Sequence, residues 1–286
     1  MVGHTAAMAQ TLGSQLATTG TIDLSTYDSR ATTGFKDKKA EALDDLVAIG
    51  EELSDLQEKL FAGGRTESSH SKILLVLQGM DTSGKGGLVR HVAGLADPQG
   101  ISITSFKKPT VDELEHDFLW RVEKALPEPG MIGVFDRSHY EDVLIGRVRE
   151  LADPAEIERR YDAINTFEKA FADTGGILIK CFLHISADDQ KERLEARLDD
   201  PTKYWKYNPG DIDERMLWDD YQDAYVTVLE RCSTKAAPWN IVPSGRKWYR
   251  NWAVATLLVE QLRGLDLDWP DANFDVEGEK ARLAAM

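Results

Sequence analysis

Residues 73–87 read Ile-Leu-Leu-Val-Leu-Gln-Gly-Met-Asp-Thr-Ser-Gly-Lys-Gly-Gly. A short apolar run is followed by a glycine-rich turn with one lysine, and then by a segment that predicts a helix. The spacing Gly79-x4-Gly84-Lys85 matches a phosphate-binding loop, in which backbone N–H groups and a helix N-terminus bind phosphate oxygens. Lys85 is predicted to reach the β- and γ-phosphates as a mobile charge. The other predicted phosphate-binding positions of the loop are Gly79, Ser83, Gly84, Gly86 and Gly87.

One position departs from that pattern, because Gly86 stands where Ser or Thr normally binds Mg²⁺. Asp81 lies inside the loop, where phosphates would repel an acid unless a divalent cation lay between them. Mg²⁺ prefers one or two carboxylates together with phosphate oxygens. We therefore interpret Asp81 as a magnesium ligand; the alternative is that Asp81 caps a helix starting near Ser83.

A second acid follows another predicted buried strand, residues 131–135. Asp136 comes directly after this strand, which is where P-loop enzymes usually place a second magnesium anchor. Arg137 could bind a phosphoryl group through two hydrogen bonds, and Glu141 is a further phosphate-site candidate. A capped helix start, with Ser138 as N-cap and Glu141 three positions later, is compatible with the same residues.

A basic and aromatic segment lies at residues 190–207 of an otherwise acidic chain. Arg193 and Arg197 share one helix face, and a loop with Lys203 and Lys206 follows. Beside a phosphate-binding loop, this segment predicts a mobile lid that brings cations over phosphates. The alternative is a solvated helix whose glutamates pair with the arginines.

Several other residues are weaker candidates. Lys107 and Lys108 follow the predicted strand 101–106 and could line a phosphate channel or form an exposed turn. Arg90 could face the same channel or solvent. Residues 218–221 have no role that can be assigned from physical reasoning. Residues 244–247 could lie near a nucleotide base, although a helix N-cap at Ser244 is the simpler interpretation.

Taken together and in order, these residues resemble the polyphosphate kinase 2 family over about residues 40–260. No single motif is specific, but the set is. The motifs that carry the resemblance are Gly79-x-Asp81-x-x-Gly84-Lys85-Gly86-Gly87, Phe106-Lys107-Lys108-Pro109-Thr110, Asp117-Phe118-Leu119-Trp120-Arg121, Phe135-Asp136-Arg137-Ser138-x-Tyr140-Glu141 and the segment from Arg193 to Lys206.

This resemblance implies phosphoryl transfer between inorganic polyphosphate and purine nucleotides, with Mg²⁺ (or Mn²⁺ in its place), on a P-loop kinase fold with a helical lid. The run Tyr140-Glu141-Asp142-Val143-Leu144 is most similar to the subgroup that uses both nucleoside mono- and diphosphates, with AMP and ADP as the expected acceptors. A homo-oligomer, either a dimer or a tetramer, is also expected. The residues expected to take part in catalysis are Asp81, Lys85, Asp136, Arg137, Arg193 and Arg197.

Composition limits the other possibilities. The 286 residues carry a net charge of −15, which argues against non-specific binding to nucleic acid or to a membrane surface. A polyanionic substrate would therefore need a local basic groove. The two cysteines, Cys181 and Cys232, indicate neither a disulfide framework nor a zinc site. No apolar run is long enough to span a membrane and no signal-like segment is recognisable, so we expect a cytoplasmic enzyme.

Alternation of apolar runs and helical patterns predicts an α/β fold: a parallel five-stranded sheet with helices on both faces. Residues 1–34 lack periodicity and are expected to be a disordered tail. Residues 35–264 are predicted to form one P-loop kinase-like domain with the lid at about 190–212, and residues 265–286 a C-terminal tail. Predicted strands are 73–78, 101–106, 131–135, 177–184 and 239–243; predicted helices are 36–62, 85–96, 112–125, 139–151, 154–174, 187–199, 213–234 and 246–263.

Two alternatives remain open from the sequence. An ATP-dependent nucleoside monophosphate kinase of the thymidylate kinase type would also have an Asp-Arg pair after a strand, but Gly86 and the basic lid disfavour it. A non-catalytic module that binds nucleotide or polyphosphate is disfavoured by the combination of Lys85, two acids and the lid. A dependence of turnover on added polyphosphate would separate these hypotheses.

Overall fold

The computed structural model describes residues 10–18 and 20–286. Its centre is a five-stranded parallel sheet in the order β2-β3-β1-β4-β5. All of these strands except the edge strand β2 are rich in buried apolar residues, as expected where a parallel sheet is covered on both faces. The strands are β1 (Lys72–Gln78), β2 (Ile101–Ser105), β3 (Ile132–Asp136), β4 (Gly176–His184) and β5 (Trp239–Pro243).

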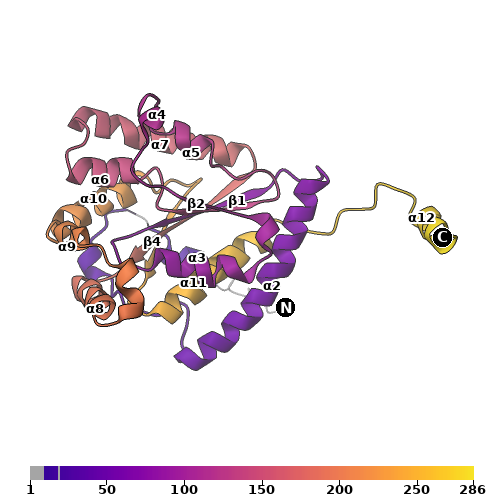
Figure 1. The fold of residues 1–286 in the computed structure, drawn as a ribbon, viewed down its shortest axis with the longest axis horizontal. Helices are drawn as coiled ribbons and strands as arrows, with labels where there is room; N and C mark the ends of the chain where they lie inside the picture. Colours follow the sequence, from indigo (N-terminus) through magenta and orange to yellow (C-terminus); the bar gives the residue numbers. More distant parts are fainter. Residues whose placement is uncertain (1–9, 19) are drawn as a thin grey trace, which may run out of the picture.

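Helices cover both faces of the sheet (Figure 1), so the predicted α/β architecture is confirmed. One layer comprises α6 (Glu141–Val148), α7 (Pro154–Asp173) and α10 (Trp218–Arg231), with the short α4 (Val111–Leu114) and α5 (Trp120–Glu123) near it. The other layer comprises α1 (Leu12–Leu16), α2 (Lys39–Arg65), α3 (Lys85–His91) and α11 (Lys247–Arg263). The remaining elements are α8 (Ala187–Leu198), α9 (Gly210–Arg215), α12 (Val276–Ala284) and the 3-10 turns η1 (Leu24–Thr26), η2 (Ala93–Leu95), η3 (Pro98–Gly100) and η4 (Pro201–Lys206).

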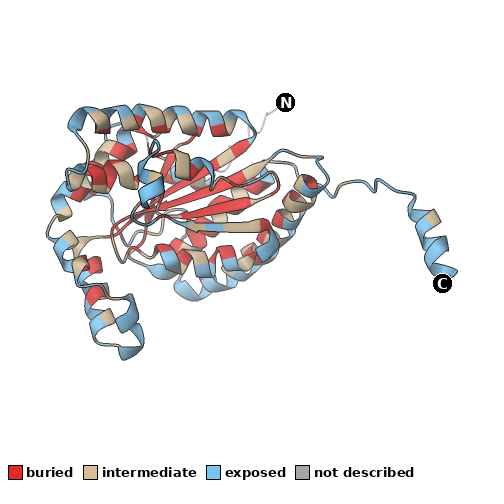
Figure 2. Ribbon diagram, turned by 45° about the horizontal axis from the view of Figure 1, so that its top comes forward, coloured by how far each residue is buried: buried red, intermediate tan, exposed pale blue. Residues whose placement is uncertain are grey.

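The core lies in two layers, one on each side of the sheet, because successive side chains of a strand point to opposite faces. Leu74 and Val76 of β1 pack among residues of α6, α7 and α10. Ile73, Leu75 and Leu77 of the same strand pack against α2, α3 and α11. The central strands are accordingly buried along their length in Figure 2, while the outer faces of the helices are exposed.

The carboxyl ends of β1 and β3 lie side by side. The two strands pair in parallel, with Leu77 opposite Asp136, and Arg137 N donates to Leu77 O over 3.2 Å. The glycine-rich loop after β1 therefore meets Asp136, the last residue of β3, and Arg137 after it at one edge of the sheet. Ligands of open α/β sheets bind outside such strand ends.

Several predicted helix boundaries differ from the structure. The helix predicted for 36–62 continues through Gly63 and Gly64 to Arg65. Gly64 does not end the helix but allows close packing, since a β-carbon there would stand 2.4 Å from Pro129 O. The helix predicted for 213–234 is two helices, α9 and α10, and the one predicted for 85–96 divides into α3 and η2. The segment 112–125 likewise contains two short helices, α4 and α5.

The expected N-terminal tail packs on the domain over residues 10–18 and 20–34. Leu12, Leu16 and Leu24 are buried, and Glu260 of α11 accepts hydrogen bonds from the backbone N–H groups of Leu12 and Gly13 at 2.6 and 3.0 Å. Periodicity fails to indicate this segment because it is held by long-range contacts, not by a continuous helix or strand. The part of the prediction that concerns residues 1–9 lies outside the described residues.

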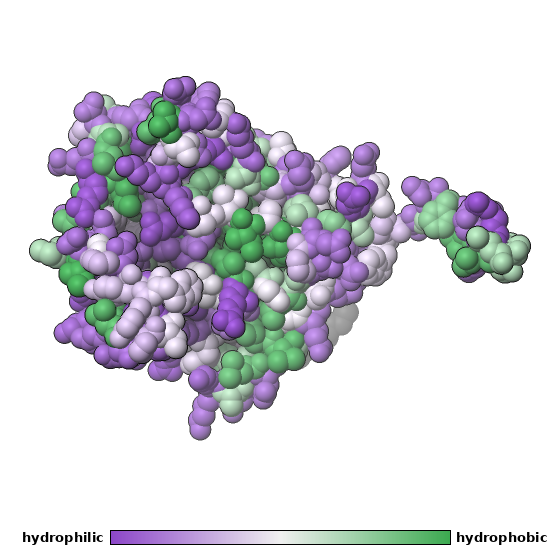
Figure 3. All heavy atoms as spheres, in the orientation of Figure 1, coloured by the Kyte–Doolittle hydropathy of each residue, from purple (hydrophilic) through white to green (hydrophobic). Residues whose placement is uncertain are grey.

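The C-terminal segment extends away from the body of the molecule and ends in α12 (Figures 1 and 3). No residue of α12 is buried. Within residues 10–18 and 20–286, no helix is both long enough and apolar enough to cross a membrane.

Candidate phosphate-binding site at the strand ends

The glycine-rich loop connects β1 to α3 and has the backbone geometry of an anion-binding turn. Gly84, the N-cap of α3, has φ of 107°, a left-handed conformation that favours glycine. A β-carbon on Gly84 would stand 1.6 Å from Nη1 of Arg250, which donates to Ser83 O over 3.1 Å. The loop is therefore packed against a buried guanidinium from α11. Asp81 does not cap this helix, since α3 begins at Lys85 after Gly84.

Lys85 is buried under the loop that it follows. Its Nζ donates to the carbonyl oxygens of Gly79 at 2.7 Å and Met80 at 3.4 Å. Burial lowers the pKa of Lys85, and the nearby Asp81 carboxylate opposes that shift. The ammonium is thus held against the backbone of the first two residues of the loop.

Arg137 joins the two predicted strand-end motifs. Its guanidinium lies 2.9 Å from Asp81 Oδ1 and 3.5 Å from Glu141 Oε2 in the first turn of α6. Arg137 also has φ of 66°, a conformation that is uncommon for a residue with a β-carbon and that is found preferentially at functional sites. Although burial opposes it, Glu141 and Asp81 raise the pKa of Arg137, so the guanidinium stays charged.

Glu141, like Asp81, is a carboxylate close to both cations of this cluster. Burial raises the pKa of Glu141, and the positive charges of Arg137 and Lys85 oppose that rise. Asp81, Lys85, Arg137 and Glu141 therefore form one charged cluster, which confirms that the two motifs come together in space.

A cavity of about 230 Å³ opens beside this cluster. It lies between the end of β1, α6 and the segment that carries α9 and α10. In Figure 3 hydrophilic residues predominate on the side of the molecule that carries α6 and α9. The cavity is lined by Gly79, Met80, Asp81, Arg137, Glu141, Leu144, Ile145, Gln190, Asn208, Gly210, Asp211, Glu214, Tyr221 and Tyr225.

Asp136 and Asp81 remain the two candidates for magnesium ligands. Within residues 10–18 and 20–286, no group of three or more His, Cys, Asp or Glu side chains is arranged to hold a metal ion. Two carboxylates at adjacent strand ends nevertheless suit Mg²⁺ in a phosphoryl-transfer site, because the ion completes its shell with phosphate oxygens and water and not with a protein cage.

The two lid arginines bind protein groups in this structure. Arg193 Nη1 donates to Thr82 O at 2.9 Å and Ser83 O at 3.3 Å, and Nη2 donates to Gly245 O at 3.1 Å and to Ser244 O. Arg197 Nη1 donates to Lys206 O at 3.0 Å and Asp211 Oδ2 at 3.1 Å. Arg193 therefore ties α8 to the phosphate loop, and Arg197 holds the lid segment together.

The remaining predicted cations are exposed and do not join the Arg137 cluster. Lys203 pairs with Asp200 at 2.8 Å, and Lys206 lies 4.9 Å from the centre of the Trp205 ring. Those two belong to η4, which is helical where an irregular loop was predicted. Arg90, Lys107 and Lys108 are exposed on the surface as well.

Arg121 shows the structural role of the motif from Asp117 to Arg121. Its guanidinium is largely buried, donates to Lys107 O over 2.9 Å and lies 3.4 Å from Asp142 Oδ2. It also lies 3.6 Å from Glu113 Oε2 of the α4 capping box. The motif from Asp117 to Arg121 thus anchors the backbone that carries Lys107 and Lys108.

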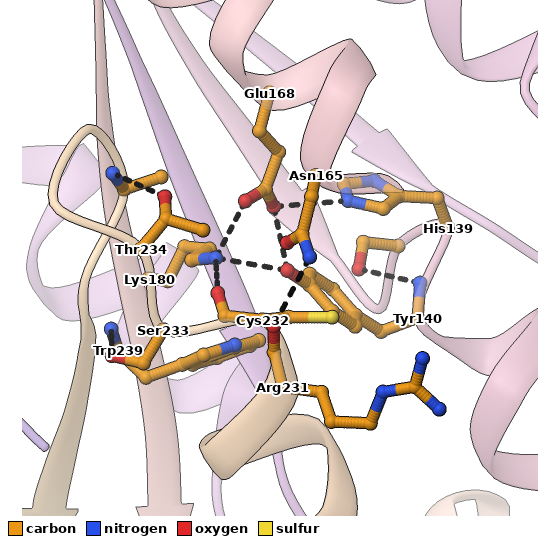
Figure 4. Close-up of polar contacts among 12 residues, drawn as sticks. His139, Tyr140, Asn165, Glu168, Lys180, Arg231, Cys232, Ser233, Thr234 and Trp239 are labelled. Atoms are coloured by element: carbon orange, nitrogen blue, oxygen red, sulfur yellow. Dashed lines mark hydrogen bonds and ion pairs between the residues drawn. The ribbon is translucent and has the colours of Figure 1, made fainter. Parts of the chain in front are cut away.

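A fully buried polar network lies behind the Arg137 turn (Figure 4). Lys180 of β4 donates to Glu168 Oε2 at 2.6 Å, Tyr140 OH at 2.9 Å and Cys232 O at 2.7 Å. Tyr140 OH donates to Glu168 Oε1 at 2.7 Å, and His139 Nε2 lies 3.3 Å from the same oxygen. Because each buried charge has partners, the network fixes residues 138–140 directly behind the Arg137–Glu141 pair.

Two predicted helix caps are wrong. Ser138 does not cap α6, which begins at Glu141 after Tyr140; its hydroxyl accepts from Gln78 Nε2 at 3.0 Å. Ser244 does not cap α11, because Arg246 occupies that position and Ser244 Oγ donates to Val242 O. Both serines satisfy buried backbone or side-chain groups near the sheet edge instead.

Sequence reasoning missed several residues of the site. Arg250 gives no local signal because it lies in a helix far along the chain from the loop that it supports. Burial and the neighbouring Arg193 lower the pKa of Arg250 to about 10. Tyr221, in the motif that had no assigned role, lines the cavity and donates to Glu214 Oε2 over 2.6 Å. The motif itself was a usable signal for Tyr221.

Comparisons with known proteins identify the family. The family model for polyphosphate kinase 2 matches residues 36–268. The chain is 43% identical to the AMP/ADP-polyphosphate phosphotransferase of Meiothermus ruber over 88% of this chain and 92% of that protein. It is 41% identical to the ADP-polyphosphate phosphotransferase of Rhodopseudomonas palustris over 77% and 79% of the two chains.

A solved structure supports the same assignment. The crystal structure of polyphosphate kinase 2 from Arthrobacter aurescens TC1 superposes with a TM-score of 0.94 at 50% identity, over 98% of this chain and 99% of that one. A fold shared at this identity, together with the family match over most of the chain, confirms the resemblance drawn from the motifs. The chain belongs to the polyphosphate kinase 2 family.

Proposed function

We propose that the protein transfers a phosphoryl group between inorganic polyphosphate and purine nucleoside mono- or diphosphates, with AMP and ADP as acceptors and Mg²⁺ as the ion. The relatives named for AMP/ADP and ADP phosphotransferase activity support this choice of nucleotides. The transfer is reversible in principle, since both donor and acceptor bonds are phosphoanhydrides. Mn²⁺ is a second candidate ion.

The observation that carries the proposal is the cluster of Asp81, Lys85, Arg137 and Glu141 beside an open cavity. Phosphoryl transfer gives protein groups little covalent chemistry to perform, so catalysis is mainly positioning and charge neutralisation. This cluster supplies both signs of charge at neighbouring strand ends.

Each residue has a separate role in the proposal. Lys85 and Arg137 neutralise the oxygens of the transferring phosphoryl group. Asp81 and Asp136 would hold Mg²⁺, which supplies electrostatic stabilisation to donor and acceptor phosphates when bound. Asp136 also orients the attacking phosphate oxygen.

In this proposal Arg193 and Arg197 of the lid act indirectly, through other protein groups. Arg193 shapes the phosphate loop through its carbonyl groups, and Arg197 maintains the fold of the lid. Lys203 and Lys206, with Arg90, Lys107 and Lys108, provide exposed cations for a polyphosphate chain. Such contacts are screened by salt, so polyphosphate affinity should fall as ionic strength rises.

The decisive experiment is a substrate panel. Purified protein is given AMP, ADP, GMP or GDP with Mg²⁺ and either polyphosphate or ATP as the donor, and nucleotide products are separated by chromatography. We expect products that depend on added polyphosphate. Products formed equally well with ATP alone would instead support a nucleoside monophosphate kinase.

A Lys85→Ala variant serves as the control for that panel. If neither donor yields product with the unaltered chain, while polyphosphate still binds, the non-catalytic module is favoured. The cytoplasmic location and the dimeric or tetrameric state remain predictions from sequence and resemblance; sedimentation of the purified protein would measure the latter.

A further inference from the structure

The N-terminal segment passes beside α8, the first helix of the lid segment (Figure 1). Four of its residues, Tyr27 to Arg30, form what we call the strap. Ser29 Oγ donates to Asp189 Oδ2 over 2.6 Å, and Arg30 Nε donates to Asp189 Oδ1 over 2.9 Å. Arg30 Nη2 also lies 2.8 Å from Glu192 Oε2. The strap thus binds two carboxylates in the first two turns of α8.

Asp189 is the buried half of this contact. Its side chain is 2% exposed, and Oδ2 also accepts from the backbone N–H of Ser186 at 3.1 Å in the capping box of α8. Although burial alone would raise it, hydrogen bonds from Ser29, Ser186 and Arg30 lower the pKa of Asp189 to about 2. A buried carboxylate with all these donors has one well-defined position.

Gly245 connects the strap to the other side of α8. Its N–H donates to Ser29 O over 2.7 Å, and its carbonyl accepts from Arg193 over 3.1 Å. A β-carbon on Gly245 would stand 2.7 Å from Arg30 Cγ and 2.9 Å from Asp189 Oδ2, so the three segments touch here. His184 Nε2, at the end of β4, lies 3.0 Å from Tyr27 O and holds the start of the strap.

Asp189 and Arg193 stand one helical turn apart on α8. The strap holds the first of them, and the second binds the carbonyl groups of Thr82 and Ser83 in the phosphate loop. Movement of the α8 N-terminus would therefore draw Arg193 away from that loop.

We propose that Arg30 and Asp189 are positioning residues: the strap holds α8 where Arg193 supports the phosphate loop, so that the binding-competent loop predominates before substrate arrives. The inference rests on the proposed function, because the consequence is measured on phosphoryl transfer. Neither residue touches the cavity beside Arg137.

Loss of the strap contact has a specific kinetic consequence. If only a fraction of molecules has a competent loop, the apparent affinity for substrate falls to that fraction of its intrinsic value, whereas saturating substrate restores the competent state. Arg30→Ala should therefore raise KM for the nucleotide on the order of 5- to 10-fold and leave kcat within about 2-fold. Arg30→Lys should recover part of the affinity, since lysine keeps the charge but cannot bridge both carboxylates.

Arg263→Ala is the matched control. Arg263 is similarly exposed and makes two 2.6 Å hydrogen bonds to Glu52, but it lies at the end of α11, outside the cavity lining. Ser29→Ala, which removes one donor to Asp189, gives a second, independent weakening of the strap. All variants are first compared by thermal unfolding. The unfolding midpoints of Arg30→Ala and Arg263→Ala should differ by no more than a few degrees.

Hydrogen exchange provides a readout that does not depend on activity. Amides of residues 187–198 should exchange faster in Arg30→Ala than in the unaltered protein or in Arg263→Ala. Unchanged KM with unchanged exchange would overturn the positioning role. Equal effects of Arg30→Ala and Arg263→Ala would overturn it as well. Absence of any polyphosphate-dependent turnover in the unaltered chain contradicts the proposed function instead, and the exchange experiment still decides the strap contact.

Discussion

Arg137 and Asp81 form a 2.9 Å salt bridge that joins the ends of β3 and β1. In the proposed reaction each partner also binds a second charged group: Asp81 would bind a magnesium ion, and Arg137 would bind a phosphoryl group. When a magnesium–phosphate complex is bound, one ion pair would thus be replaced by two favourable contacts. The salt bridge keeps both side chains at the strand ends in the meantime.

Asp81→Asn and Asp136→Asn should each lower turnover by at least about 10²-fold. The amide keeps the shape of the side chain but loses the charge that attracts Mg²⁺. The half-saturating Mg²⁺ concentration should also rise in both variants, as measured by initial rates over a magnesium series. Asp173→Asn, which alters an exposed pair with Lys169, is the matched control. If either variant kept the wild-type rate at limiting Mg²⁺, the acid replaced in that variant would not be a magnesium ligand.

Lys85→Ala should lower kcat on the order of 10² to 10³. The transition state loses a cation that the loop holds in place, while the fold loses two hydrogen bonds to backbone carbonyls, each worth about 1 kcal/mol. Steady-state kinetics and urea unfolding on the same preparation separate these effects. Lys169→Ala, at an exposed lysine, should change neither; a near-normal kcat for Lys85→Ala would exclude Lys85 from the mechanism.

Gly84→Ala and Gly86→Ala should differ in stability although the two glycines are two positions apart. Gly84 has φ of 107° and would place a β-carbon 1.6 Å from the Arg250 guanidinium, so the variant combines backbone strain with displacement of Arg250. The strain alone is worth about 1–3 kcal/mol. A β-carbon on Gly86 meets no atom within 4 Å, so unfolding of that variant should be unchanged or slightly harder. Equal midpoints in urea would contradict the packing described here.

Acidification should expose the contribution of Asp189. Its folded pKa of about 2 lies below the ordinary value of 3.8, so its stabilising effect is complete above pH 3.8 and is lost as the pH falls towards 2. The free energy of unfolding should therefore decline less steeply between pH 4 and pH 2 in Asp189→Asn than in the unaltered protein. Parallel declines in the two proteins would show that this carboxyl has the same pKa folded and unfolded.

The lid should gain protection on substrate binding. Residues 190–212 carry cations that pair with protein groups in the empty protein, such as Arg197 with Asp211 and Lys203 with Asp200. Added phosphates would give these cations further partners, so hydrogen exchange there should slow when nucleotide and polyphosphate are added together. Arg197→Lys should impair turnover despite keeping the charge. Nη1 of Arg197 binds Lys206 O and Asp211 Oδ2, which leaves Nη2 and Nε for a phosphate, whereas lysine has a single nitrogen and no planar fork. High protection without ligand, unchanged on binding, would favour a static lid.

The sheet and the strand-end cluster could be predicted from the sequence because both depend on local patterns. Five apolar runs indicated the strands, and parallel pairing places the ends of the strands before Gly79 and Asp136 at one edge. The contacts of Arg193 and Arg250 could not be predicted, because their partners are backbone carbonyls from distant loops. Every residue type carries the same backbone carbonyl, so the sequence does not show which carbonyl an arginine binds. The lid arginines were therefore assigned to phosphate alone.

The N-terminal segment shows the same limit for packing. Leu12 and Leu16 are four residues apart, too short a pattern to indicate an amphipathic helix, and yet both are buried against the core. Glu260, 248 residues away in the sequence from Leu12, accepts a hydrogen bond from the backbone at the start of α1 and so helps to hold this helix on the core.

The ordered segment at residues 10–34 has a practical consequence for how the domain is delimited. A recombinant version that began at residue 36, where the family match begins, would retain every strand and the phosphate loop. It would also uncover the apolar surface now covered by Leu12, Leu16, Ile22 and Leu24 on both sides of the sheet. Such newly bared surface promotes self-association. The part of the chain that packs as one body is therefore longer at its N-terminal end than the stretch that the family model matches.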